Sequence, residues 1–307
     1  MTRFLQQRLA LAIPTILLTS VVVFLMLHLI PGDPASIYVG ENQATPERLE
    51  AIREQMGLNR PLYVQYADYV WSAVRGDLGR SLQNDQPVTK IIRERLPNTF
   101  KLAAAAMVIA VILGVALGLL AALKHNTWLD TLSMSVALLG VSMPIFWLAL
   151  LLILFFSVRL QWLPATSQPG LKGLILPAVS LAMLSAATLA RLVRSSVLEV
   201  LRQDYLTTAR AKGLPGRTVI LRHAVRNALI PVITVIGLQF GSLLSGAVIT
   251  ETIFARPGLG KLVVDSIQNK DFPTVQGAIL ILATIYIVMN LLVVLSYALI
   301  DPRIRLG

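Results

Sequence analysis

The 307-residue sequence contains no cysteine and only three histidines. It therefore excludes disulfide bonds, thiolate metal sites and cysteine nucleophiles, and the scattered histidines form no metal-ligand cluster. Charged residues are also scarce, at 14%, whereas hydrophobic residues make up 55% and the mean hydropathy is +0.71. This balance excludes a soluble enzyme and is typical of a protein that crosses a membrane several times.

The sequence also lacks the motifs of nucleotide binding and of hydrolysis. Gly258 and Gly260 precede Lys261, but no glycine stands five residues before Gly260, and the lysine is followed by Leu262 rather than by Ser or Thr. This segment is therefore not a phosphate-binding P-loop. GxSxG and HExxH are absent as well, so no motif supports an intramembrane enzyme.

Six apolar runs are long enough to be membrane-spanning helices, which predicts an all-α, polytopic membrane protein. They are residues 9–30, 99–123, 131–158, 174–190, 232–250 and 278–300. The first run is followed directly by Pro31 and lacks the shorter core and small residues of a cleaved signal peptide, so we expect it to be retained. Gly114 and Gly118 in the second run predict close helix packing.

The charges orient these spans. On the side of the two termini, the ends and loops hold thirteen Lys and Arg against four Asp and Glu. On the other side, thirteen cations are balanced by twelve acids. The positive-inside rule therefore places both termini in the cytoplasm. The net charge of +11 then follows from topology and does not require a nucleic-acid partner.

Three domains are predicted: an N-terminal transmembrane helix (1–30), an extracytoplasmic helical domain (31–98) and a five-helix core (99–307). In the polar domain we expect one helix from Pro46 to Gly57 and another run that ends before Pro97, after which Asn98 caps the second span. Between these lies a further stripe, more consistent with packing than with ligand recognition, made of Tyr63, Tyr66, Ala67, Val70 and Val74.

A few polar or helix-breaking residues interrupt the apolar spans. They are Ser142, Met143 and Pro144 in the third span, Gln239 in the fifth and Asn290 in the sixth. Such groups are costly in a bilayer unless they face water or one another, so they are candidates for a translocation path. A packing kink at Pro144 and helix–helix hydrogen bonding account for them equally well.

The most distinctive stretch is a polar hairpin, residues 199–227, between the fourth and fifth spans. Six basic residues outnumber two acidic ones there, so it lies in water. Gly213 suits the left-handed position that ends a helix, and Pro215 prevents its continuation. Two short helices joined by a corner are therefore predicted, although a merely basic cytoplasmic loop is the simpler alternative.

The sequence of this hairpin, DYLTTARAKGL followed by RHAVRNALIP, resembles the conserved cytoplasmic loop of binding-protein-dependent ABC importer permeases. LIPGDP, MGLNRPLYVQY, GDLGRS and ETIFARPGLGKLVVDSIQNKDFPTVQG resemble the dipeptide, oligopeptide and nickel branch of that family. The resemblance implies the type I importer permease fold in a bacterial inner membrane. One departure is Thr207-Thr208-Ala209, where the general family has Glu-Ala-Ala, so the role of that glutamate is not transferred.

The resemblance also implies roles for residues. The coupling helix that docks on an ATPase would comprise Asp204, Tyr205, Thr207, Thr208, Ala209, Arg210, Ala211, Lys212, Gly213 and Leu214. The loop would close through Arg222, His223, Arg226, Asn227 and Pro231. An outer mouth would contain Glu251, Pro257, Gly258, Gly260 and Asp271. In that segment Leu259, Leu262, Val263 and Ile267 share one face, which predicts an amphipathic helix.

The partners follow from the same resemblance. They are a second permease subunit, two ATPase subunits that bind ATP and Mg, an extracytoplasmic solute-binding protein and membrane lipid; no cofactor and no metal are expected in this chain. Short peptides are the expected cargo, because the spans offer no Cys or His-carboxylate set for a metal ion. Glutathione and a nickel chelate remain alternatives. For the class of protein, an ion-coupled secondary transporter is a distant alternative, since no ionisable residue lies well inside a span.

Overall fold

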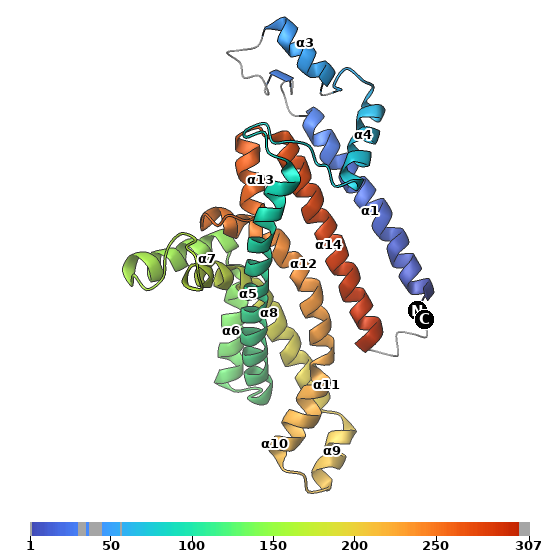
Figure 1. Cartoon of the computed structure of the whole chain (residues 1–307). Coiled ribbons are helices and arrows are strands. Elements are labelled where there is room, and N and C mark those ends of the chain that lie inside the picture. The colour runs from blue at the N-terminus through green and yellow to red at the C-terminus, as the bar shows by residue number, and fades with distance from the viewer. Residues whose placement is uncertain (1, 30–34, 37–44, 56, 301–307) are drawn as a thin grey trace. The chain divides into compact units, whose positions relative to one another are not determined.

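The computed structural model describes residues 2–29, 35–36, 45–55 and 57–300, and these residues form helices and their connections (Figure 1). In this part of the chain, the one β-structure is an isolated antiparallel bridge between Arg80 and Pro87. The all-α prediction is therefore confirmed for the described residues. The chain divides into two compact units, Met1–Pro97 with Pro257–Ile287 and Asn98–Arg256 with Val288–Gly307.

The first unit combines the N-terminal helix with the polar domain and a segment from the last third of the chain. Its helices are α1 (Thr2–Leu29), α3 (Pro46–Gln55), α4 (Leu62–Val74), the start of α5 (Val88–Leu123), α13 (Leu259–Gln268) and the first part of α14 (Phe272–Ile300). Leu78, Val88 and Ile92 form its core with side chains of α13 and α14. The amphipathic helix predicted in the outer segment is α13; Leu259 and Val263 are buried, whereas Ile267 is 53% exposed.

Helix α4 packs against α1 through aromatic rings. The rings of Tyr66 and Tyr69 lie 5.5 and 5.9 Å from that of Phe24, and the Ser20 and Tyr66 hydroxyls are 2.8 Å apart. The predicted stripe on α4 was right about packing but partly wrong about its members, because Tyr63, Ala67 and Val74 are exposed. The contact face is set by the position of α1, which the periodicity of α4 alone does not give.

Helix α5 corrects two predictions at once. It runs without a break from Val88 to Leu123 with Pro97 inside it, so no helix ends before Pro97 and Asn98 is not a cap. A proline in a helix interior removes one hydrogen bond and costs about 3 kcal/mol. The buried Ile92 before Pro97 and the buried Leu102 after it supply packing energy that offsets this cost.

The second unit contains most of the apolar helices. They are the remainder of α5, α6 (Trp128–Ser142), α7 (Ile145–Leu152) with the π-helical stretch η1 (Ile153–Arg159), α8 (Lys172–Leu201), α12 (Ile230–Ile253) and the end of α14. Helix α8 lies at the centre of this unit and packs against α6, α7 and α12. It continues to Leu201, well past the predicted end of the fourth span.

Two glycines allow α5 to approach α8 closely. A Cβ atom on Gly114 would lie 2.6 Å from Leu189 Cβ, and one on Gly118 would lie 2.6 Å from the Ala190 carbonyl oxygen and from Val193 Cβ. Any side chain at either position would push the two helices apart. The close helix packing predicted from Gly114 and Gly118 is therefore confirmed.

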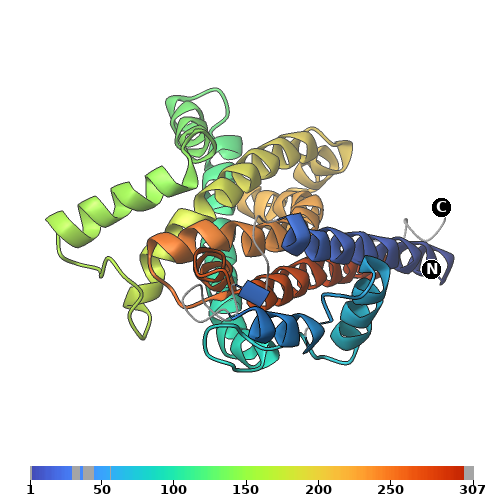
Figure 2. The same ribbon diagram turned by 90° about the horizontal axis from the view of Figure 1, so that it is seen from above.

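The third apolar run is not one continuous helix. Helix α6 ends at Ser142, and α7 leaves it at an angle of 107°, which Figure 2 shows as a yellow-green segment that leads away from α6. Pro144 stands directly before α7, where its fixed φ suits the start of a helix and its missing N–H is not needed. The kink considered for Pro144 is thus a sharp turn between two helices.

Four helices in the described part are long and apolar enough to cross a membrane: α5, α8, α12 and α14. The bent pair of α6 with α7 and η1 would make a fifth if it counts as one span. Helix α1 contributes a shorter apolar stretch over Ala10–Met26.

Candidate functional site

The polar hairpin leaves the end of α8 and returns to α12, and its two arms are visible in Figure 1 as the segments labelled α9 and α10. The first arm is α9 (Asp204–Ala211). The second is a continuous run of α10 (Gly216–Thr218), the π-helical stretch η2 (Val219–Val225) and α11 (Arg226–Ala228). Gly213 between them has φ = +77°, which confirms the predicted left-handed corner.

The hairpin has an apolar core of its own. Leu206 from the first arm and Val219 and Ala224 from the second are fully buried, and Val200, Leu201 and Ala209 pack against them. Burial of one leucine side chain stabilises a fold by about 1.5–3 kcal/mol. The two arms are therefore held together as one body rather than as a loose loop.

A polar contact also joins the two arms. The side-chain amide of Asn227 donates a hydrogen bond to the Tyr205 hydroxyl over 2.9 Å, and that hydroxyl donates to the His223 carbonyl oxygen over 3.4 Å. Residues predicted for the coupling helix and for the closure of the loop thus meet in the structure.

The outer surface of the hairpin carries nearly all the other predicted residues. Most residues of the two arms and of the corner between them are exposed, as is Pro231 at the start of α12: Asp204, Thr207, Thr208, Arg210, Ala211, Lys212, Gly213, Leu214, Arg222, Arg226 and Pro231. His223 is half-buried. Ala209 differs, because it turns toward the apolar core and is only partly accessible. The small exposed side chains on α9 are therefore those of Thr207, Thr208 and Ala211.

The hairpin surface is strongly basic. Its six cationic side chains are exposed, and none of them makes an ion pair with a described residue: Arg202, Arg210, Lys212, Arg217, Arg222 and Arg226. Glu199 and Asp204 are the acids of this stretch, and both are exposed. Such a surface is complementary to acidic groups on a partner.

An ion pair with a buried carboxylate lies near the same end of α8 and was not predicted. Arg194 contacts Asp130 through two hydrogen bonds, Nε to Oδ1 at 2.7 Å and Nη2 to Oδ2 at 2.8 Å. Asp130 Oδ2 also accepts from the Asn126 amide and lies 3.0 Å from His125 Nδ1. The pair connects the start of α6 to α8. The one signal for this ion pair in the sequence is that Asp130 is the single acid of the loop at 124–130.

In the part of the chain that the structure describes, no hydrogen bond joins the predicted translocation residues to one another. Ser142 and Pro144 are exposed and Met143 is half-buried at the bend before α7, whereas Gln239 on α12 and Asn290 on α14 are half-buried. In the described part of the chain, no side-chain hydrogen bond involves Ser142, Gln239 or Asn290.

The contact between α12 and the end of α14 shows how Gln239 and Asn290 are turned. A Cβ atom on Gly237 would lie 2.8 Å from Val293 Cγ1, so the two helices touch there. Asn290 is three residues before Val293 and shares its face, whereas Gln239 is two residues after Gly237 and points to another side of α12.

The outer-mouth residues fall into two groups, one in each unit. In the second unit, Glu251 is fully buried at the end of α12 and accepts a hydrogen bond from Thr99 Oγ1 at 2.6 Å. Arg256 is also buried and donates from Nη1 to Ser167 Oγ at 3.3 Å. Burial lowers the pKa of Arg256, and the charge of Glu251 opposes this shift.

In the first unit, Asp271 is buried and holds a loop in place. Its carboxylate accepts hydrogen bonds from Ser81 Oγ at 2.5 Å, from the Leu82 amide at 3.0 Å and from Thr274 Oγ1 at 2.8 Å. Pro257 is exposed, and Gly258 and Gly260 are buried at the start of α13. Glu251 and Asp271 thus have structural partners. No group of three or more potential metal ligands occurs among the residues that the structure describes.

Two family models match this chain. Residues 114–306 match the binding-protein-dependent transport system inner membrane component, and residues 1–103 match the N-terminal part of the membrane component of such systems. The chain belongs to this permease family. The family predicted from the sequence is therefore confirmed, and the permease is a multi-pass inner-membrane protein.

Curated relatives match the permease over almost its whole length. The dipeptide transport system permease protein DppB of Alkalihalophilus pseudofirmus is 44% identical over 99% of this chain and 100% of the relative. The glutathione transport system permease protein GsiC of Escherichia coli K12 is 45% identical over 99% of both chains. A putative peptide transport system permease protein of Brucella abortus is also 45% identical, over 99% of both chains.

Two solved structures share the fold of the permease. The MetNI methionine ABC transporter in an inward-facing conformation gives a TM-score of 0.58 at 14% identity, and the match covers 69% of this chain and 96% of that chain. An amino acid ABC transporter with histidines gives 0.54 at 18% identity over 70% and 94%. The predicted fold of ABC importer permeases is supported by this likeness.

Proposed function

We propose that this permease is one transmembrane subunit of an ATP-driven importer of short peptides. The cargo class is supported by the identity of 44–45% over 99% of the chain to a dipeptide permease and to a putative peptide permease. The observation that carries the mechanism is the hairpin: an apolar core makes it one body, and its six exposed cations form no ion pair with a described residue.

The hairpin acts as the coupling element. Helix α9 lies in a cleft of an ATPase subunit, with the small side chains of Thr207, Thr208 and Ala211 allowing close approach. Arg210 and Lys212 meet acidic or carbonyl groups of that subunit. Gly213 sets the angle at which α9 is presented, because its left-handed backbone makes the corner.

The remaining partners are a second permease subunit, two ATPase subunits that bind ATP and Mg, and an extracytoplasmic solute-binding protein. The permease itself catalyses no reaction, and chemical energy comes from the ATPases. The outer-mouth residues Glu251 and Asp271 are the candidates for contact with the solute-binding protein; Glu251 accepts from the Thr99 hydroxyl in the second unit, and Asp271 holds Ser81 and the Leu82 amide in the first. Ser142, Gln239 and Asn290 are the candidates for the path.

The proposed topology has six spans and cytoplasmic termini. Helix α1 and the bent pair of α6 with α7 and η1 complete the set begun by the four long apolar helices. The excess of Lys and Arg on the side of the termini supports this orientation. In this arrangement the hairpin is cytoplasmic, where an ATPase can reach it.

Glutathione is a second candidate cargo. It is favoured by the permease GsiC of Escherichia coli, which is 45% identical to this chain and is named for glutathione transport. Since glutathione is itself a tripeptide, the two candidates require the same mechanism and differ in what the solute-binding protein selects.

Uptake by the reconstituted importer tests both parts of the proposal. The permease is co-expressed with its partner permease and ATPase subunits and placed in proteoliposomes, and uptake of a radiolabelled dipeptide is measured with ATP inside and the solute-binding protein outside. Dipeptide uptake that glutathione does not inhibit supports the peptide assignment. Uptake that needs an ion gradient and no ATP contradicts the assignment as an ATP-driven importer.

A crosslink tests the coupling role separately. The chain has no cysteine, so a single cysteine in place of the exposed Thr208 can be joined only to a partner. We expect a crosslink to an ATPase subunit from Thr208→Cys and none from Asn84→Cys, which lies on the exposed loop of the other unit. A crosslink from neither position leaves the coupling assignment without support.

A further inference from the structure

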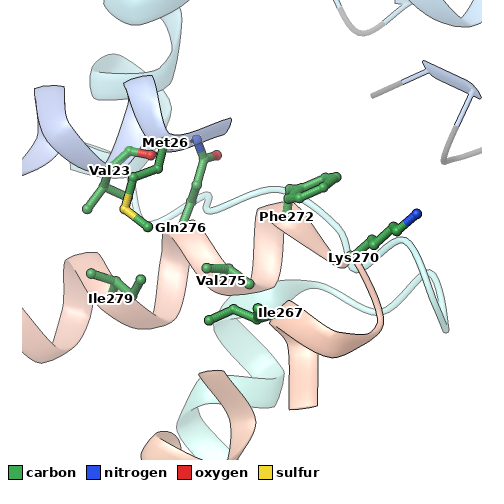
Figure 3. Close-up of a pocket in the computed structure, with 8 residues that line it drawn as sticks. All are labelled: Val23, Met26, Ile267, Lys270, Phe272, Val275, Gln276 and Ile279. Atoms are coloured by element: carbon green, nitrogen blue, oxygen red, sulfur yellow. Dashed lines mark hydrogen bonds between the residues drawn. The ribbon is translucent and has the colours of Figure 1, made fainter. Parts of the chain in front are cut away.

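An apolar groove lies within the first unit, between α1 and the start of α14. Its volume is about 330 Å³, and Val23, Met26, Ile267, Lys270, Phe272, Val275, Gln276 and Ile279 line it (Figure 3). Six of these side chains are apolar. The polar side chain of Gln276 is used internally, since it donates a hydrogen bond to the Val23 carbonyl oxygen at 3.3 Å.

The lining residues form two rows that follow the helix axes. Phe272, Val275 and Ile279 recur at the spacing of one face of α14, and Val23 and Met26 are one turn apart on α1. The groove therefore runs along both helices. A long, flexible and apolar ligand fits this shape better than a compact one does.

The groove begins where both helices pass from apolar to polar surroundings. Met26 lies four residues before Ile30, the last residue of the apolar run at 9–30, and α14 begins at Phe272, directly after the polar run Gln268-Asn269-Lys270-Asp271. In a helix that crosses the bilayer, this boundary lies at the level of the lipid headgroups. The part of the groove that Val23 and Ile279 line is then at the depth of the acyl chains.

Lys270 supplies a cation at the polar end of the groove. Its side chain is exposed and forms no ion pair with any described acid. The two nearest acids in the sequence are engaged elsewhere, Asp271 with Ser81 and Asp265 with Lys261. Lys270 also has φ = +56°, at the position after a helix end where glycine is usual, so a charged side chain is held where it is conformationally costly.

We propose that this groove binds an anionic phospholipid, with one acyl chain against Val23, Val275 and Ile279 and with the phosphate at Lys270. An apolar tail joined to an anionic head is the chemistry that matches a cation above an apolar channel at headgroup level. A helix from another subunit would cover the apolar rows as well, but it would not account for the cation at their polar end.

Photolabelling in membranes tests this site. The full chain is expressed, and membrane vesicles are mixed with phosphatidylglycerol that carries a diazirine in one acyl chain. After irradiation, mass spectrometry locates the labelled residues. We expect labels on Met26 and Ile279, a several-fold decrease in Lys270→Gln, and no decrease in Lys90→Gln, which removes an exposed lysine of the same unit that pairs with no described acid.

Two further measurements distinguish a bound lipid from a protein segment that covers the groove. Ile267→Trp fills the groove from an exposed position and leaves the charge in place, so it should also lower the labelling. Phosphatidylcholine with the same diazirine should label these residues more weakly. Equal labelling in Lys270→Gln and Lys90→Gln, or labels spread evenly over exposed apolar side chains, overturns the proposal. A crosslink from Ile267→Cys to another protein chain, without lipid labelling, shows that protein covers the groove and also overturns it.

Discussion

The amide of Asn227 and the hydroxyl of Tyr205 form a 2.9 Å hydrogen bond across the hairpin, between residues 22 positions apart in the sequence. Both side chains are exposed, so this bond contributes little to global stability. It joins α9 to the second arm, so we expect it to set the angle between them, while the apolar core holds the two arms together.

We therefore expect Tyr205→Phe to reduce coupling more than folding. The loss of one exposed hydrogen bond costs about 0.5–1.5 kcal/mol at most. Substrate-stimulated ATP hydrolysis of the assembled importer should fall, whereas the amount of protein in the membrane should not. Tyr63→Phe, which alters an exposed tyrosine of α4, is the matched control. Unchanged stimulation in Tyr205→Phe means that the angle of the arms is set by the core alone.

Gly213→Val tests the corner of the hairpin. No atom lies within 4 Å of the position that a Cβ would occupy, so the effect comes from the backbone rather than from a clash. A β-branched residue in the left-handed region costs about 1–2 kcal/mol and tilts α9. ATP-driven uptake should fall while insertion stays normal.

Two controls accompany this variant. Asparagine tolerates the left-handed region, so Gly213→Asn should keep most of the activity. Gly216→Ala changes an equally open glycine that has no positive φ and should be neutral. Full uptake by Gly213→Val contradicts a role for the corner in coupling.

Arg194→Ala should destabilise the second unit. It leaves the buried carboxylate of Asp130 without its two-bond partner, which costs about 1–3 kcal/mol. Arg194→Lys should restore only part of this loss, because lysine cannot form the two parallel hydrogen bonds. Arg191→Ala removes an exposed arginine of the same helix and serves as the control. The measurement is the thermal unfolding midpoint of the purified permease; equal midpoints for Arg194→Ala and Arg191→Ala rule out a stabilising role of the pair.

Cysteine labelling tests the topology. The absence of native cysteine means that each introduced thiol gives an unambiguous signal. Asn84→Cys and Asn269→Cys occupy exposed positions that should react with an impermeant reagent added outside intact cells. Thr207→Cys on the hairpin should react only after the membrane is opened. External labelling at Thr207 overturns the orientation.

Gln239→Trp tests the translocation path. If Gln239 faces the path, a bulky side chain should lower uptake several-fold while the complex still assembles. Leu238→Trp places the same bulk on a neighbouring, exposed apolar position of α12 and should be tolerated. Loss of assembly in Gln239→Trp, measured by co-purification of the other subunits, identifies Gln239 as a packing residue instead.

The features that sequence predicted well are those with a local cause. Gly213 was predicted in the left-handed region because only its neighbours decide that conformation. Gly114 and Gly118 indicated close packing because a residue without a side chain allows another helix to approach, whichever helix that is. The family was confirmed because its motifs are contiguous stretches of sequence.

The features that sequence missed depend on distant residues. Asp130 and Arg194 are 64 positions apart, Thr99 and Glu251 are 152 apart, and Ser81 and Asp271 are 190 apart, so no local pattern connects them. Pro97 was expected to end a helix because proline usually does so. Packing on both sides of it, which only the folded chain reveals, keeps α5 continuous.

Helix α8 has a mechanical consequence for the importer. It is 30 residues long, which corresponds to about 45 Å, and beyond Pro177 it contains neither proline nor glycine. Its last turn contributes Val200 and Leu201 to the core of the hairpin, and Arg194 binds it to α6. The part of α8 between Pro177 and Leu201 therefore contains no residue at which a helix usually bends. We therefore expect a displacement of the hairpin by a few ångströms to reach Pro177, about 36 Å from the hairpin end of α8, as a rigid-body tilt.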